Sequence, residues 1–352
     1  MWNGLYHPAQ DERCDECGRV FYWDNLKFVA ITLVVVGHFV FVTQLSPAMS
    51  AIRFSIYLFH MPLFVFVSGY FSKSFVKGHR FKVEKIISYL SLWVALKVAL
   101  FLADRLMLGT AWSQFTFLSA GDLPWYMLSM AAWLTTVFLV KDISPKYVMA
   151  ASIVFAVVAG YSPVFSSTFS ASRIVTFAPF FLLGFYVDKQ RAWKTLETRW
   201  LPVAALAFLA SLLAVVFVST HELHRISGFF SGLNSYASLG LPVLGGPVRL
   251  AVMGFSALTG FAVMCLVPRR RLLIAALGSR TLQIYCLHYF LVDLFVRYRI
   301  GNALQTYVPS LWKPVVILIG IAVTFALSAR FFEPPFRWVM SWKLATARHS
   351  RG

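Results

Sequence analysis

The sequence predicts an all-α, polytopic integral membrane protein with about ten transmembrane helices. Of its 352 residues, 59% are hydrophobic and only 13% are charged, whereas soluble domains contain about 25% charged residues. The apolar residues also occur in blocks about as long as a bilayer is thick, which is typical of membrane-spanning helices. Together these two observations exclude a soluble fold.

Ten apolar blocks are candidates for spanning helices. Pro and Gly mark many of their ends, as in Ser46-Pro47 and Ser162-Pro163, where turns are favoured. The long glycine-rich segment at about 219–248 is expected to contribute to an entrance on the outer side. The predicted spans are 26–44, 52–72, 86–104, 124–140, 147–161, 172–187, 200–218, 249–267, 281–298 and 314–336.

The distribution of basic residues predicts the orientation. With the N-terminus in the cytosol, 22 of the 32 Lys and Arg residues lie in inside segments, 8 in outside segments and 2 within spans. Basic residues accumulate in cytosolic loops, so both termini are predicted to be cytosolic. The protein is predicted to lie in the inner (cytoplasmic) membrane. The same rule explains the net charge of +18 without a nucleic-acid partner. Residues 1–22 are polar, with no cleavable signal peptide, so the first span is expected to direct insertion.

Three histidines lie within predicted spans: His38, His60 and His288. His38 follows Lys27 by eleven residues, about 16 Å along a helix and roughly half of a hydrocarbon layer. Ionisable residues at that depth are usually functional. His38 has three interpretations: a packing residue hydrogen bonded to a neighbouring helix, a general base, or a nucleophile. No His-x3-His spacing supports a metal site, and Cys14 with Cys17 lacks a second pair of ligands.

Lys27 also has two interpretations. It either extends to the cytosolic interface beside Asp24, or faces an anionic ligand that enters from the cytosol. The basic groups at 73–85 and 269–271 are explained by topology alone, although clustered cations would also suit the phosphates of a nucleotide-bearing compound.

Five segments resemble one family of membrane enzymes. Lys27 and His38, with ten residues between them, resemble the basic-x10-His signature of the membrane acyltransferase-3 family. A second segment resembles the second-helix pattern of the fucose 4-O-acetylase-like branch, and three others resemble its later segments. These four are Phe59-His-Met-Pro-Leu-Phe-Val-Phe-Val-Ser-Gly-Tyr70, Leu123-Pro-Trp-Tyr-Met-Leu128, Phe177-Ala-Pro-Phe-Phe-Leu-Leu-Gly184 and Gly278-Ser-Arg-Thr-Leu-Gln-Ile-Tyr-Cys-Leu-His288.

The resemblance runs from about residue 22 to 340 and implies a ten-helix O-acyltransferase. Such enzymes transfer an acetyl group from cytosolic acetyl-CoA to a hydroxyl of an extracytoplasmic glycan or glycolipid. No metal is expected, since the sequence lacks a ligand spacing that would hold one. The implied domain is 23–340, between a cytosolic segment 1–22 and a basic tail 341–352. An Arg-x-x-Arg motif is frequent in the family, whereas this chain has Lys82-x-x-Lys85, and lysine cannot form the same bidentate contacts.

The candidate site residues follow from the resemblance and from position in the spans. The catalytic candidates are His38 and His60. The candidates for binding acetyl-CoA are Lys27, Arg80, Lys82 and Lys85. The candidates for binding the acceptor are Trp125, Tyr126, Arg173 and His288. The alternatives are a glycolipid transporter or flippase that uses the histidines as a proton relay, or a structural or sensory membrane protein.

Overall fold

The computed structural model describes residues 21–342 apart from 44–45, 77–81, 110, 118–122, 164, 166–168 and 220–222. Within these ranges the chain forms helices, turns and bends and no strand, so the all-helical fold class is confirmed. Five helices are each long and apolar enough to cross a membrane, and two bent helix pairs would raise that number to seven. The protein is therefore a multi-pass helical membrane protein.

Each predicted span overlaps a helix of 14 or more residues. These helices are α1 (Phe21–Phe41), α2 (Pro47–Phe71), α3 (Val83–Leu108), α4 (Trp125–Leu139), α5 (Pro145–Val158), α7 (Ala171–Tyr186), α9 (Leu201–Val218), α11 (Gly245–Leu266), α12 (Thr281–Arg297) and α14 (Trp312–Leu327). Shorter helices are α8 (Lys189–Leu196), α13 (Ile300–Tyr307) and α15 (Glu333–Met340).

The predicted span 314–336 is not one continuous helix. Helix α14 ends at Leu327, and the chain then bends by 61° into the segment 330–340. Pro334 and Pro335 lie in the first turn of α15, where the missing N–H groups are tolerated, but they could not continue α14. A sharper bend of 93° separates α7 from α8, and Asp188 caps α8 by accepting a hydrogen bond from the Arg191 N–H at 2.8 Å.

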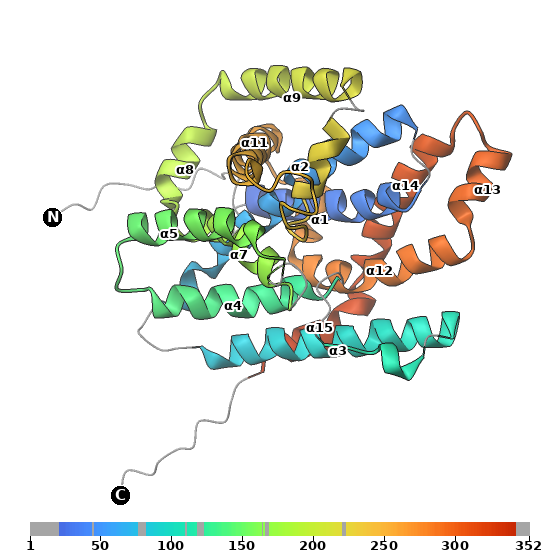
Figure 1. The fold of residues 1–352 in the computed structure, drawn as a ribbon, viewed down its shortest axis with the longest axis horizontal. Helices are drawn as coiled ribbons and strands as arrows, with labels where there is room; N and C mark the ends of the chain where they lie inside the picture. The colour runs from blue at the N-terminus through green and yellow to red at the C-terminus, as the bar shows by residue number, and fades with distance from the viewer. Residues whose placement is uncertain are drawn as a thin grey trace, which may run out of the picture.

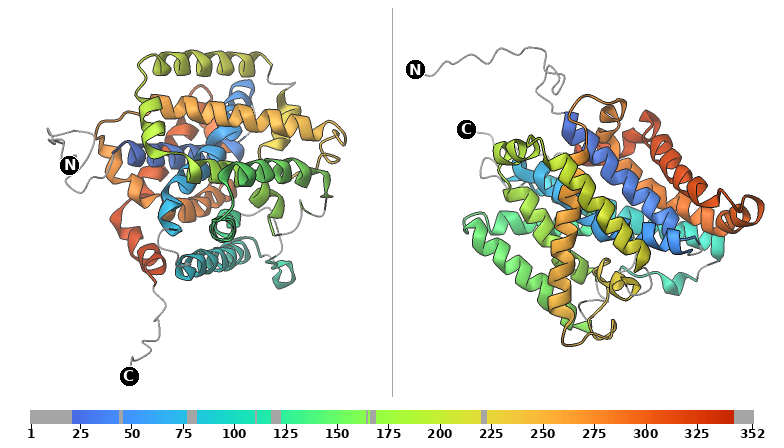
Figure 2. Two further views of the ribbon diagram at one scale, coloured as in Figure 1. Left: turned by 90° about the vertical axis from the view of Figure 1, so that its left-hand side faces the viewer. Right: turned by 90° about the horizontal axis from the view of Figure 1, so that it is seen from above.

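Helices α1 and α2 form the centre of the molecule (Figure 1). Helix α1 packs against α2, α12 and α14, and α2 packs against α7, α9 and α11 as well. Helix α9 lies at one edge and α3 at the opposite edge, where α3 packs on α4 and α15 (Figure 2). The edge helix α9 is largely exposed, with only 11% of its residues buried in the protein, as expected for a surface that faces lipid.

Two glycines allow α2 and α7 to cross at very short distance. A Cβ atom on Gly69 would lie 2.0 Å from the carbonyl oxygen of Phe181, and one on Gly184 would lie 1.9 Å from that of Phe66. Small residues at helix crossings let backbones approach closely in membranes. The crossing therefore holds α7, which carries Arg173 near its first turn, against α2, which carries His60.

The segment between α9 and α11 is fixed by a buried arginine. Arg249 of α11 is 1% exposed, donates a hydrogen bond to the carbonyl of Phe229, and stacks on the rings of Phe229 and Tyr236. The hydroxyl of Tyr236 in turn donates to the carbonyl of Val157 at 2.7 Å. These contacts hold the turn at 227–234 over the ends of α2 and α7.

Candidate active site

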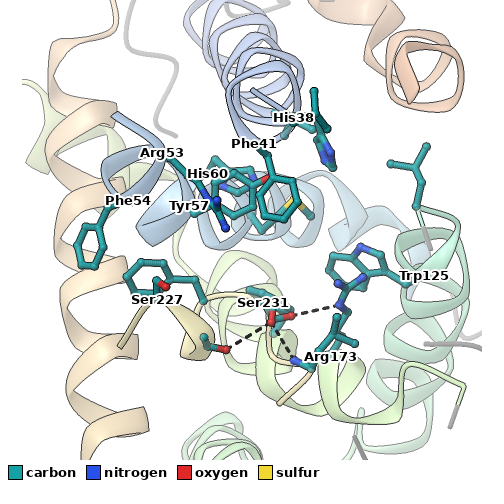
Figure 3. Close-up of a pocket in the computed structure, with 18 of the residues that line it drawn as sticks. His38, Phe41, Arg53, Phe54, Tyr57, His60, Trp125, Arg173, Ser227 and Ser231 are labelled. Carbon is teal, nitrogen blue, oxygen red and sulfur yellow. Dashed lines mark hydrogen bonds between the residues drawn. The ribbon is translucent and has the colours of Figure 1, made fainter. Parts of the chain in front are cut away.

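A cavity of about 460 Å³ lies among α1, α2, α4, α7, α12 and the turn at 227–234 (Figure 3). We call it the His38 cavity. Its wall on α2 is a stripe of side chains at helical spacing, so that one face of the helix supplies them. They are Ser50, Arg53, Phe54, Tyr57, His60 and Met61. Three residues of the 219–248 segment, Ser227, Ser231 and Asn234, also line the cavity.

His38 lies in the last turn of α1 and its ring is partly exposed to the cavity. Its imidazole makes no hydrogen bond within the described part of the chain. The depth of His38 in the helix bundle can be judged from its neighbour Tyr57, because the centroids of the two rings are 6.4 Å apart. Tyr57 is ten residues from the start of α2, about 15 Å along the helix. The His38 imidazole is thus accessible from the cavity but lies well inside the helix bundle, away from the N-terminal end of α2.

His60 faces the same cavity but is held by its own helix. Its Nδ1 lies 2.8 Å from the carbonyl oxygen of Ile56. Since a carbonyl can only accept, Nδ1 carries the proton and Nε2 is a hydrogen-bond acceptor. The ring of Tyr57 contacts His60 at 4.7 Å between centroids. Tyr57 therefore touches both histidines, and the structure brings the two predicted catalytic residues to one cavity.

His288 is completely buried behind His38 and does not line the cavity. Its ring is edge-on to that of His38, with 5.2 Å between centroids. Its Nδ1 donates to the carbonyl of Tyr285 at 2.8 Å, and its buried Nε2 has no partner among the described residues. His288, which was predicted to bind the acceptor, thus contacts His38 and does not line the cavity.

Of the other predicted acceptor-binding residues, two line the cavity and one does not. Arg173 Nε donates to the carbonyl of Ser231 at 3.2 Å, and its guanidinium lies 5.0 Å from the ring centre of Trp125. Tyr126 instead points away from the cavity, where its hydroxyl and that of Ser68 share a hydrogen bond of 2.5 Å.

Sequence reasoning missed Arg53, Tyr57 and Tyr289 as cavity residues. The spacing of Arg53, Tyr57 and His60, at four and then three residues, was a usable signal for the first two, because such residues share a helix face. Nothing in the local sequence indicates Tyr289, which contacts His38 from α12 at 5.7 Å between ring centroids.

A second cavity of about 730 Å³ lies at the opposite end of α1, and we call it the Lys27 cavity. Lys27 is ion-paired with Asp24 at 2.7 Å, while α8 adds Lys189 and Lys194. The rings of Trp23 and Tyr70 also line it and are stacked at 3.8 Å between centroids. The lining of the Lys27 cavity thus combines three ammonium groups with two carboxylates, those of Asp24 and Glu197, and with flat aromatic surfaces.

Two other predicted donor-binding residues, Lys82 and Lys85, lie outside this cavity. Lys82 Nζ donates to the carbonyl of Ser74 at 2.7 Å, and Lys85 Nζ donates to that of Met340 at 2.5 Å. Neither lysine lines the Lys27 cavity. Arg80 lies outside the described residues, as do Cys14 and Cys17. In the part of the chain that is described, no group of three or more His, Cys, Asp or Glu side chains is arranged to hold a metal ion.

The fold and the two cavities define a multi-pass helical membrane protein with an imidazole site and a cationic site at opposite ends of its central helix. A family model described as an acyltransferase domain, that of the acyltransferase-3 family, matches residues 20–329. The chain belongs to this family and is a membrane acyltransferase.

One curated relative adds to this assignment. The chain is 26% identical to the nodulation protein NolL of Mesorhizobium japonicum over 207 residues, which cover 53% of this chain and 54% of that protein. The chain thus spans about half the length of the curated relative it matches. No solved structure matches the chain.

Proposed function

We propose that the protein transfers an acetyl group from cytosolic acetyl-CoA to a hydroxyl of an extracytoplasmic glycan or glycolipid. The observation that carries this proposal is the pair of cavities at the two ends of α1, one with Lys27 and one with His38. Eleven residues separate Lys27 from His38, about 16 Å along the helix. The extended pantetheine arm of a CoA thioester is long enough to cover such a distance.

The Lys27 cavity suits the nucleotide end of the donor. Ammonium groups bind phosphates as point charges, and Lys27, Lys189 and Lys194 supply three of them. The stacked rings of Trp23 and Tyr70 offer a surface for the adenine base. We place the phosphates and the base here and the thioester toward His38.

The His38 cavity suits the chemical step. His38 accepts the proton of the acceptor hydroxyl, whose oxygen attacks the thioester carbonyl carbon. A C–O bond forms, the C–S bond breaks, and CoA leaves as a thiolate that recovers the proton from the imidazolium. His60 orients the hydroxyl through its acceptor Nε2. Acylation of His38 itself is the alternative first step, and an acetylated enzyme trapped without acceptor would reveal it.

The proposed topology gives the reaction its direction. We place ten spans at the ten apolar blocks, and the 22-to-8 distribution of basic residues favours the segments 1–22 and 341–352 in the cytosol. Residues 23–340 then form the transmembrane acyltransferase domain in the inner membrane. The Lys27 cavity opens to the cytosol and the His38 cavity to the outside. Between the two cavities along α2 lie Phe64 and Ser68, both in contact with Tyr126, and the pantetheine arm has to pass these side chains to bring the thioester to His38.

Sealed vesicles of known orientation test this proposal directly. Labelled acetyl-CoA should be consumed, with release of CoA, only when it is supplied on the face that carries the termini, and the acetylated product should appear on the other face. A protein with His38→Ala is the control for background transfer. Equal activity with both reactants on one face would contradict transfer across the membrane, and transport without CoA release would favour a transporter.

A further inference from the structure

A third cavity is a groove in the side of the helix bundle, with a volume of about 280 Å³. It lies between α7 and α11, which both pack on α2, and α8, bent by 93° from α7, lies at one end (Figure 1). We call it the α8 groove, and its lining includes Leu63 of α2, Leu183 of α7, Arg191 of α8 and Ala257 of α11. Leu183 and Ala257 are exposed. Since α7 and α11 are apolar helices of a membrane protein, the groove is open to the surrounding lipid.

The wall of the groove is apolar between these helices because its hydroxyl group there is already hydrogen bonded. Pro62 lies inside α2 and has no N–H, so the carbonyl of Leu58 lacks its usual donor one turn later. Ser256 of α11 donates to that carbonyl at 2.5 Å. The other described residues of α2, α7 and α11 that line the groove are apolar. Such a wall can bind hydrocarbon through van der Waals contact without leaving a polar group unsatisfied.

Helix α8 presents one face to each of two cavities. Lys189 and Lys194 line the Lys27 cavity. Arg191 and Thr195 line the α8 groove instead. The Arg191 guanidinium makes no ion pair or hydrogen bond with the described part of the chain, and no acidic side chain is among the described residues that line the groove. Binding of the acyl donor therefore does not account for Arg191.

A cation at one end of an apolar groove fits the two parts of a phospholipid. A guanidinium binds a phosphate through two parallel N–H groups, and an acyl chain can fill the apolar remainder. The volume of about 280 Å³ is slightly below the range of about 300–1,000 Å³ that is usual for compact ligands. It suits a slender chain, part of which stays in the bilayer.

The charge of α8 favours an anionic lipid. Residues 189–196 include three basic side chains and no acidic one. Under the proposed orientation this helix lies on the cytosolic side, because Lys189 and Lys194 line the same cavity as Lys27. Anionic lipids of the cytoplasmic leaflet attract basic segments near its surface.

We propose that the α8 groove binds an anionic phospholipid of the cytosolic leaflet, with one acyl chain between α7 and α11 and the phosphate at Arg191. This site goes beyond acetyl transfer and does not depend on it. The lipid supports α8 from one side, while Lys189 and Lys194 face the donor cavity on the other.

Photolabelling of the full chain in detergent micelles tests this proposal. The probe is phosphatidylglycerol with a diazirine in one acyl chain, and the matching phosphatidylcholine is the zwitterionic comparison. Peptide mass spectrometry should locate the label in the parts of α2, α7 and α11 that line the groove. Half-saturation should require about three- to tenfold less phosphatidylglycerol than phosphatidylcholine, the range for a partly screened contact with a charged group.

Variants assign the two parts of the lipid. Arg191→Gln should abolish the difference between the two lipids and keep the label in the groove. Ala257→Phe should remove most of the groove label with both lipids, because the larger side chain fills the opening. Gly260→Leu is a second filling variant, since a Cβ atom at Gly260 would lie 3.7 Å from that of Leu63, an ordinary van der Waals distance. Thermal unfolding shows whether each variant is folded.

Two matched controls should behave as the wild type does. Arg199→Gln removes an exposed arginine just beyond α8 that does not line the groove. Ala251→Phe enlarges an exposed alanine of α11 outside the groove.

Three outcomes would overturn the inference. One is equal half-saturation by the two lipids, and another is a groove label no stronger than the label on the exposed helix α9. The third is a loss of lipid preference in Arg199→Gln as large as that in Arg191→Gln.

Discussion

The imidazoles of His38 and His288 lie edge-on to each other, with 5.2 Å between their ring centroids. His288 is 0% exposed, its Nδ1 donates to the backbone, and its Nε2 is a buried acceptor without a partner among the described residues. Buried polar groups normally have a partner. We infer that Nε2 is an acceptor next to the position where positive charge develops when His38 takes up a proton. His288 would thus be a positioning residue that acts through His38.

Replacement of His288 by Phe tests this relationship, because it keeps an aromatic ring and removes the acceptor atom. We expect kcat to fall about tenfold to a hundredfold, as for loss of one hydrogen bond to a charged group, with little change in the KM for acetyl-CoA. Steady-state CoA release measures both constants. Cys286→Ala, which changes another fully buried residue of α12, should leave kcat near the wild-type value. Wild-type kcat in His288→Phe would make His288 a packing residue only.

His38→Ala should reduce transfer by ~10²–10⁴-fold, the usual loss when a general base is removed. The protein should still insert and fold, because the His38 ring makes no hydrogen bond within the described chain. CoA release by purified protein gives the rate, and thermal unfolding reports the fold. Thr32→Ala on the same helix is the matched control, since its hydroxyl donates to the carbonyl of Phe28 one turn earlier, at 2.8 Å. Activity of His38→Ala within a few-fold of wild type would exclude a catalytic role.

Lys27→Ala should raise the KM for acetyl-CoA about three- to tenfold and lower kcat less. Solvent screening weakens the contribution that a partly exposed ammonium group makes to binding, so the expected effect is modest. Loss of an interaction that binds the ground state and the transition state equally raises KM selectively. Lys189→Ala and Lys194→Ala should act in the same direction because both line the same cavity. Lys146→Ala, an exposed lysine outside both cavities, is the control for net charge.

The same assay tests the predicted donor-binding role of Lys82 and Lys85. Their ammonium groups are hydrogen bonded to backbone carbonyls outside the Lys27 cavity. The test is the double variant Lys82→Ala/Lys85→Ala. If it raises the KM as much as Lys27→Ala does, the donor site extends to the start of α3. An unchanged KM would confine it to the Lys27 cavity.

Gly184→Ala should lower stability, because its new Cβ atom would lie 1.9 Å from the carbonyl oxygen of Phe66. The backbones of α2 and α7 must then separate, and overpacking of this kind typically costs about 1–3 kcal/mol. Thermal unfolding in detergent should show a lower Tm than wild type. Gly254→Ala is a matched control within α11, since nothing lies within 4 Å of its Cβ position. Equal Tm values for the two variants would show that the crossing can open without cost.

Features that depend on a single stretch of chain could be predicted from the amino-acid sequence. The apolar blocks identified the helices because burial of backbone in lipid requires helical hydrogen bonding. The positions of Lys27 and His38 on one helix set their separation, since the helical rise is constant. The family resemblance was readable for the same reason, because each of its segments is local and contiguous.

Contacts between residues from distant parts of the chain became known from the three-dimensional structure. It placed His288 against His38, Arg173 opposite the arginine-bearing stripe of α2, and the lysines of α8 beside Lys27, while Tyr126 turned away from the cavity. In a membrane helix nearly every face is apolar, so hydrophobic periodicity does not reveal which face meets which partner. Which helices become neighbours depends instead on close backbone crossings, such as that at Gly69 and Gly184. This steric fit exists only after the helices have packed.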